Sequence, residues 1–197
     1  GAAGRRRACD AVGDALARSG TSVRPACMHP TDLYIVRHGP AEDEHPDHPG
    51  DDQARRLTDD GIERVRLAAA GARALGYVPS QIWTSPLTRA SHTASLFSQA
   101  FGPQVDVVTT PALATFGANA DVRAALAAAS VDSVMVVGHE PNLSDLVSEL
   151  CAGGFLRVAL KKSSLVHVRL RELRGGLIGE LVAYLPPRAL RAAAGER

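Results

Sequence analysis

The amino-acid sequence predicts an α/β domain: a three-layer α/β/α sandwich with a mostly parallel sheet and a C-terminal hairpin. From Thr31 onward, short apolar runs alternate with longer segments of helical periodicity, which is the pattern of strand–helix units. The runs at 32–36 and 133–138 are continuously apolar, as expected of strands that helices bury on both faces. Residues 163–185 instead contain two strand-like runs around Gly175 and Gly176, which is a hairpin signal.

The first strand–helix unit starts with "DLYIV" at 32–36. A helix is expected next, within "LTDDGIERVRLAAAGARALG" at 57–76. Thr58 is its expected N-cap, two aspartates follow at the positive end of the helix dipole, and Gly76 ends the helix. A second strand is expected at 80–85, "SQIWTS".

The later elements continue the same alternation. Ser85 is expected to cap a helix that has Pro86 as its first residue, and Gly102 stops that helix. The remaining expected elements are a strand at 105–110, a helix at 120–130, a strand at 133–138, a helix from Pro141 to Gly153-Gly154, and the hairpin at 163–185.

The composition excludes several classes of function. The net charge of the 197 residues is +1, so no global field favours nucleic acid or an anionic membrane. No apolar run approaches the roughly 20 residues that a membrane-spanning helix needs. The three cysteines, Cys9, Cys27 and Cys151, are odd in number and form no CxxC pair, which favours a reduced, cytoplasmic setting. The many arginines and alanines, with Lys161 and Lys162 as the only lysines, indicate a high-GC bacterial genome.

The domain is expected to span residues 29–197, starting next to Met28, a candidate native start. Residues 1–28 are expected to be an N-terminal extension or tag, since they lie outside the strand–helix pattern. They suit either a poorly ordered tail or a short amphipathic helix that Gly20 would stop.

Polar side chains follow the expected parallel strands. Arg37 and His38 follow the first strand, Ser85 and Arg89 follow the second, and His139 follows the strand at 133–138. Because the carboxyl ends of parallel strands share one edge of a sheet, these side chains should converge. Two arginines offer planar forks for phosphate oxygens, one histidine can act as a nucleophile, and the other can stabilise charge or move a proton. The pattern therefore predicts an oxyanion clamp and a nucleophile held at a rigid strand end, and we also expect Ser85, Asn142 and Glu42 to contribute to substrate binding.

Three segments that carry these residues resemble a known family. "VRHGPAE", "TSPLTRASHTA" and "VVGHEPNLSDL" are similar to the three signature blocks of the histidine phosphatase superfamily, whose relatives include the phosphoglycerate mutases. The resemblance extends from about Thr31 to Arg191. It implies that His38 is the phospho-accepting nucleophile. It implies that Arg37 and Arg89 bind the phosphate and that His139 hydrogen-bonds the transferring phosphoryl group.

Departures from the wider family favour one branch. The segment between Arg89 and His139 has room for a strand and a helix but not for the long helical insert of the mutases, so little lid is expected. An open site suits a phosphorylated protein surface, and the ending "LPPRALRA" resembles that of small bacterial phosphohistidine phosphatases. Ala112 also stands where ester-cleaving relatives usually have a general-acid glutamate. An imidazole leaving group, with an unperturbed pKa of about 6.5, needs such an acid far less than an alkoxide does.

The alternatives concern the acid, a metal and the function itself. Glu42, Asp43 or Glu44 could supply the missing acid. The segment 42–52 has carboxylates and histidines, but its prolines break regular ligand spacing, so we expect a solvated loop, no metal and no cofactor. The leading prediction is a metal-independent phosphatase that acts on the phosphohistidine of a phosphorelay domain. A phosphatase of small phosphomonoesters and a non-catalytic phospho-binding module are the other two.

Overall fold

The computed structural model describes residues 30–173 and 176–196. They form a six-stranded sheet in the order β3-β2-β4-β1-β5-β6. The first four strands are parallel, and β5 and β6 form an antiparallel hairpin whose first strand pairs with β1, so the predicted sheet is confirmed. The strands are β1 (Asp32–Arg37), β2 (Gln81–Thr84), β3 (Asp106–Thr109), β4 (Ser133–Gly138), β5 (Leu165–Leu173) and β6 (Gly176–Leu185). The predicted extension at 1–28 lies outside the described residues.

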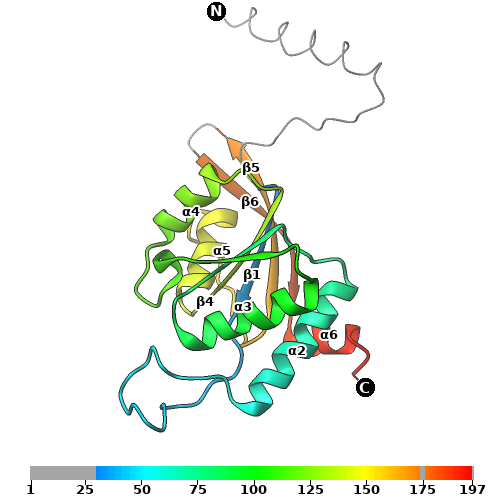
Figure 1. Cartoon of the computed structure of the whole chain (residues 1–197). Coiled ribbons are helices and arrows are strands. Elements are labelled where there is room, and N and C mark those ends of the chain that lie inside the picture. The colour runs from blue at the N-terminus through cyan, green and yellow to red at the C-terminus, as the bar shows by residue number, and fades with distance from the viewer. Residues whose placement is uncertain (1–29, 174–175, 197) are drawn as a thin grey trace, which may run out of the picture.

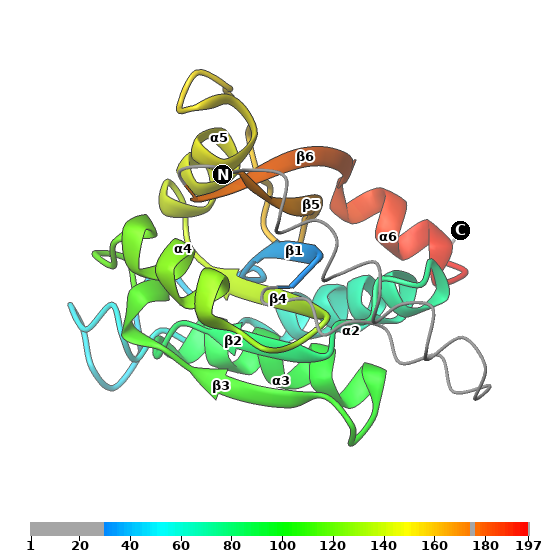
Figure 2. The same cartoon turned by 90° about the horizontal axis from the view of Figure 1, so that it is seen from above.

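Helices cover both faces of the sheet, which makes the predicted three layers (Figures 1 and 2). One face carries α2 (Asp59–Ala74), α3 (Thr88–Phe101) and α6 (Pro187–Ala193), and the other carries α4 (Asn119–Ala128) and α5 (Asn142–Ala152). None of the helices in the described part of the chain has the length and apolar character to cross a bilayer.

The central strands divide their side chains between the two layers. In β1, Tyr34 and Val36 pack with α2 and α3, whereas Leu33 and Ile35 pack with α4 and α5. Side chains that alternate between two apolar layers explain why this strand is an uninterrupted apolar run in the sequence.

Of the two predicted helix N-caps, one is confirmed and the other is wrong. The Thr58 hydroxyl accepts a hydrogen bond of 2.9 Å from the Gly61 N–H, so the N-cap of α2 is confirmed. The predicted cap at Ser85 is wrong, because α3 begins at Thr88 and its N-cap, Leu87, is extended with no side-chain cap. The physical reason is that the Ser85 hydroxyl is engaged locally, accepting the Leu87 N–H at 3.2 Å and contacting His139.

Helix α6 was not predicted from the sequence. Its first residue is Pro187, and it packs closely on α2. A Cβ atom at Gly71 of α2 would lie 1.8 Å from the Leu190 carbonyl oxygen, so only glycine allows this approach. The proline at the start of the helix was the signal that sequence reasoning passed over.

Candidate active site

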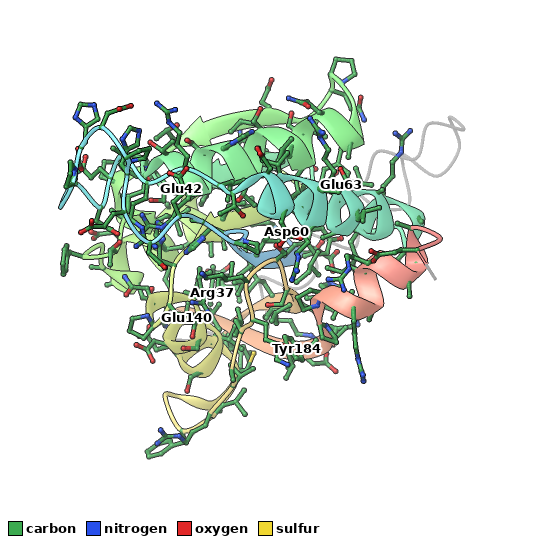
Figure 3. All side chains as sticks on the ribbon, turned by 90° about the horizontal axis from the view of Figure 1, so that it is seen from below. Arg37, Glu42, Asp60, Glu63, Glu140 and Tyr184 are labelled. Atoms are coloured by element: carbon green, nitrogen blue, oxygen red, sulfur yellow. The ribbon has the colours of Figure 1, made fainter. Side chains whose placement is uncertain are left out.

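The two predicted site histidines lie side by side at the carboxyl edge of the sheet. Arg37 pairs with Gly138 at the ends of β1 and β4, and the His38 N–H donates to the Gly138 carbonyl at 3.1 Å. His38 and His139 therefore leave neighbouring strands at the same level, with ring centroids 5.1 Å apart. Both are buried, with 6% and 3% of their surface exposed. Figure 3 looks onto this edge and shows Arg37 near its middle.

The hydrogen bonding of His38 fixes its tautomer. Its Nδ1 lies 2.7 Å from the Gly39 carbonyl oxygen, which can only accept, so Nδ1 carries the proton. The lone pair is then on Nε2, which has no hydrogen-bond partner among the described residues. Burial lowers the pKa of His38 to about 3, with the charges of His139, Arg89 and Arg37 adding to the effect and the Gly39 carbonyl opposing it. His38 is thus a neutral imidazole with an available Nε2 lone pair.

Gly39 and Thr93 hold the backbone behind His38. A Cβ at Gly39 would lie 2.4 Å from the Val65 side chain of α2, so glycine lets β1 end close against that helix. The Gly39 N–H donates to the Thr93 hydroxyl at 3.1 Å, and this hydroxyl donates to the Arg89 carbonyl at 2.7 Å. Buried Thr93 therefore links the segment of His38 to the helix that carries Arg89, a role that the sequence analysis missed.

Ser85 contacts the second histidine. His139 Nε2 and Ser85 Oγ are 2.9 Å apart, while His139 Nδ1 is buried and has no partner among the described residues. Burial lowers the pKa of His139 to about 4, helped by Arg89 and opposed by Asp52. Ser85 therefore orients His139, and its predicted contact with substrate stays a prediction.

The two arginines each keep a buried donor without a partner in the described part of the chain. Arg37 donates from Nη1 to the Leu160 carbonyl at 2.8 Å, and Arg89 donates to the Asp52 carbonyl at 2.6 Å and to its carboxylate at 2.9 Å. In both arginines Nε is buried and unpartnered. Buried polar groups in proteins are normally hydrogen-bonded, so these groups, with His139 Nδ1, are suited to bind a phosphoryl group next to His38.

Asp52 and Arg55 are site residues that sequence reasoning missed. Asp52 accepts hydrogen bonds from Arg89 and, at 2.8 Å, from Arg55, whose Nε donates to the Glu42 carbonyl at 2.7 Å. Burial acts to raise the pKa of Asp52, but the two arginines outweigh it and hold the pKa below its usual value. No sequence signal marked these residues: Asp52 ends the segment 42–52 that was taken for a solvated loop, Arg55 follows it, and Asp52 reaches Arg89 only through tertiary contact.

Glu140 is a second missed carboxylate, and it directly follows His139. Its Oε1 accepts a hydrogen bond of 3.2 Å from the Ser144 N–H. Burial raises the pKa of Glu140, although Ser144 and Arg37 partly offset this effect. Figure 3 shows it beside Arg37 on the same face. A carboxyl that holds its proton more strongly than usual is a candidate general acid.

Two predicted substrate-binding residues have other surroundings. The Asn142 amide donates to the Gly117 carbonyl at 2.9 Å and so supports the loop before α4. Glu42 lines a separate hollow of about 540 Å³, together with Arg56 and His92 but neither site histidine. Their roles in substrate binding stay predictions.

The described residues contain no group of three or more histidines, cysteines, aspartates or glutamates placed to hold a metal ion. His45 and His48, which raised the possibility of a metal site, have ring centroids 4.9 Å apart, and the His45 Nδ1 accepts the Asp47 N–H at 3.1 Å. These histidines therefore contribute to the internal structure of their loop.

Comparison with known sequences matches a family model and a relative of the chain. The family model of the histidine phosphatase superfamily, branch 1, matches residues 33–120. An uncharacterized protein of Picosynechococcus sp. is 34% identical over 143 residues, which cover 70% of this chain and 84% of that protein.

Comparison with solved structures gives matches to proteins described as histidine phosphatases and to a phosphoglycerate mutase. The protein histidine phosphatase SixA, solved with tungstate, is 28% identical with a TM-score of 0.71, and the match covers 81% of this chain and 99% of SixA. The SixA protein of Agrobacterium tumefaciens is 25% identical with a TM-score of 0.67, covering 80% and 99% of the two chains. A phosphoglycerate mutase of Bacillus anthracis, 14% identical with a TM-score of 0.60 over 86% and 99%, shares the fold.

Proposed function

Because the chain belongs to the histidine phosphatase superfamily, we propose that it hydrolyses phosphohistidine on protein substrates through a covalent phosphohistidine on His38. The observation that carries the proposal is the arrangement around His38: a neutral ring with an available Nε2, next to His139 and the unpartnered Nε donors of Arg37 and Arg89. The SixA structure supports the choice of substrate, since that relative is described as a protein histidine phosphatase.

The reaction has two displacements at phosphorus. Arg37 and Arg89 bind the phosphoryl oxygens, and Nε2 of His38 attacks the phosphorus while the substrate P–N bond breaks. The substrate imidazole takes a proton from solvent on its other ring nitrogen and leaves as the neutral ring, with the electron pair of the broken bond. A water molecule then attacks the phosphorus on His38 and releases a proton to solvent. The Nε2–P bond breaks, its electron pair returns to Nε2, and the products are inorganic phosphate and the original imidazole. His139 hydrogen-bonds the charge that builds up on the phosphoryl oxygens in both steps.

The residue at position 112 supports P–N over P–O cleavage. Ala112 lies in the short 3₁₀ turn Pro111–Leu113 after β3, half-buried against the apolar layer of α4 and α5. It offers no proton to a leaving alkoxide, whereas an imidazole, with an unperturbed pKa of about 6.5, can take its proton from solvent and needs no acid from the enzyme. The proposed partner is therefore a histidine phosphotransfer domain in the cytoplasm, and the chemistry uses no metal.

Glu140 favours a second candidate function, the hydrolysis of small phosphate esters. A carboxyl with a raised pKa beside His139 could protonate an alkoxide. Glu140→Gln should then abolish turnover of alkyl phosphates while sparing phosphohistidine. If both substrates respond equally, Glu140 has no part in selecting between them.

The test is release of inorganic phosphate from a phosphorylated histidine phosphotransfer domain, compared with sugar phosphates, in the presence of EDTA. We expect a kcat/KM at least about 100-fold higher for the phosphoprotein, in line with the contribution of a general acid that esters would need. Chelator should leave the rate unchanged, and His38→Ala should remove it. Preferential turnover of sugar phosphates, or rates that zinc or magnesium must restore, would contradict the proposal. Turnover of neither substrate would support a non-catalytic module.

A further inference from the structure

A strongly basic groove adjoins the candidate active site. It has a volume of about 840 Å³ and lies between the turn before β5, the end of β6 and α6. Tyr184 and three prolines form part of its wall, and no aspartate or glutamate lines it. Six basic side chains line this basic groove: Arg37, Arg64, Lys161, Lys162, Arg188 and Arg191. Arg37 belongs to both the groove and the site, and Figure 3 shows Arg37 and Tyr184 on the same face.

Four of these six cations, Arg37 among them, are not neutralised by an ion pair within the described part of the chain. Arg64 pairs with Asp60, and Arg191 pairs with Glu196. Lys161, Lys162 and Arg188 have neither an ion pair nor a side-chain hydrogen bond there. Both lysines of the chain thus lie in the groove, and a protein of net charge +1 concentrates a positive patch beside its phosphate site.

The turn that carries the lysines is tied to the catalytic strand. The Ser163 N–H donates to the carbonyls of Arg37 at 3.0 Å and His38 at 3.3 Å. Ser163 is buried with φ of 64°, a left-handed conformation that is unusual for serine, and its hydroxyl has no partner among the described residues. Lys161 and Lys162 are therefore held at a fixed place relative to the His38 nucleophile.

We propose that the basic groove docks an acidic segment of the phosphoprotein whose phosphohistidine enters the active site. The inference rests on the proposed function and adds that recognition depends on negative charge beside the phosphohistidine. Lys161 and Arg188 are exposed, and exposed cations bind one small anion weakly but act together on a partner with several negative charges. Tyr184 and the prolines provide the rigid, partly apolar wall that suits a peptide chain.

The test uses two synthetic peptides. Each has one phosphohistidine, flanked on both sides by glutamates in one peptide and by glutamines in the other. We expect wild type to favour the glutamate peptide by about tenfold in kcat/KM at low salt, because charge complementarity mainly accelerates association. The preference should shrink as salt rises and the Debye length falls from about 10 Å at 0.1 M to about 3 Å at 1 M.

Two triple variants locate the effect. The groove variant is K161Q/K162Q/R188Q, and the control, R66Q/R157Q/R169Q, removes the same charge from exposed arginines outside the groove. The preference for the glutamate peptide should disappear in the groove variant and persist in the control. An equal loss in both variants, or no preference in wild type, would overturn the inference.

Binding separates this inference from the proposed function. Both triple variants are also made in the His38→Ala background, and the dissociation constant of each phosphopeptide is measured by calorimetry. If wild type hydrolyses neither peptide but binding still depends on the groove and on glutamate, docking is supported and the catalytic proposal fails. If hydrolysis is intact but binding is the same in both triple variants, docking fails and the catalytic proposal stands. Groove-dependent binding of a small bisphosphate, without preference between the peptides, would also overturn docking of an acidic segment.

Discussion

At the scale of single residues, the account depends on which proton each group holds. Nδ1 of His38 donates to its own neighbour's carbonyl, and burial keeps the ring neutral, so Nε2 can attack without prior deprotonation. Asp52 has a lowered pKa and stays ionised beside Arg89, whereas Glu140 has a raised pKa. Two carboxylates of the candidate site, one beside Arg89 and the other near Arg37, thus differ in their readiness to give a proton.

Ala112→Glu tests the leaving-group argument. A glutamate here should raise kcat/KM for alkyl phosphates, because a positioned general acid contributes about 100- to 10,000-fold. It should change phosphohistidine turnover much less. Ala120→Glu, on the exposed side of α4, is the control for the added charge, and thermal unfolding verifies that half-buried Ala112 tolerates the change. An unaltered ratio of the two activities, in a folded variant, would count against the argument.

At the scale of elements, much of the structure could be predicted from the sequence. Strand β1 and the start of α2 were predictable because continuous burial and a threonine cap leave local signals. The sequence-distant histidines were predicted to meet because parallel strands share their carboxyl edge. The contact of Asp52 with Arg89 was not predictable, because it depends on how a loop folds back on α3. The prediction that Ser85 caps α3 was wrong, because its hydroxyl contacts the ring of His139, which follows a neighbouring strand, and does not cap the helix.

Thr93→Val should weaken catalysis, because Thr93 links the segment that carries His38 to the helix that carries Arg89. The substitution removes the hydroxyl that accepts from Gly39 and donates to the Arg89 carbonyl, so His38 and Arg89 lose a shared anchor. We expect kcat/KM to fall by about tenfold, the cost of one buried hydrogen bond of roughly 1.5 kcal/mol. Thr93→Ser keeps the hydroxyl and should retain most of the rate. Equal losses in the valine and serine variants would show that the methyl group, not the hydroxyl, is what matters.

At the scale of the whole molecule, the two buried histidines of the site lower the free energy of unfolding in acid. The folded-state pKa values of His38 and His139, about 3 and about 4, lie below the unfolded value of about 6.5. Between pH 4 and 6.5 the unfolded chain therefore binds more protons, so stability falls as pH falls through that window.

Urea unfolding at pH 7 and pH 5 measures this effect. Lowering the pH from 7 to 5 should reduce the free energy of unfolding by about 2 kcal/mol for each histidine. Each pH unit below the unfolded pKa contributes about 1.4 kcal/mol to this loss. The double variant His38→Gln, His139→Gln should lose correspondingly less stability over the same interval. The same loss in wild type and double variant would mean that other groups carry the acid sensitivity.

The central claim is that His38 carries the phosphoryl group, and trapping the intermediate tests it most directly. Wild-type protein is mixed with a labelled phosphohistidine peptide, quenched in base and digested, and the label is located by mass spectrometry. The account predicts an acid-labile, base-stable phosphate on His38 that is missing from the His38→Ala protein. Label on a serine, an aspartate or His139 instead, with turnover intact, would contradict it.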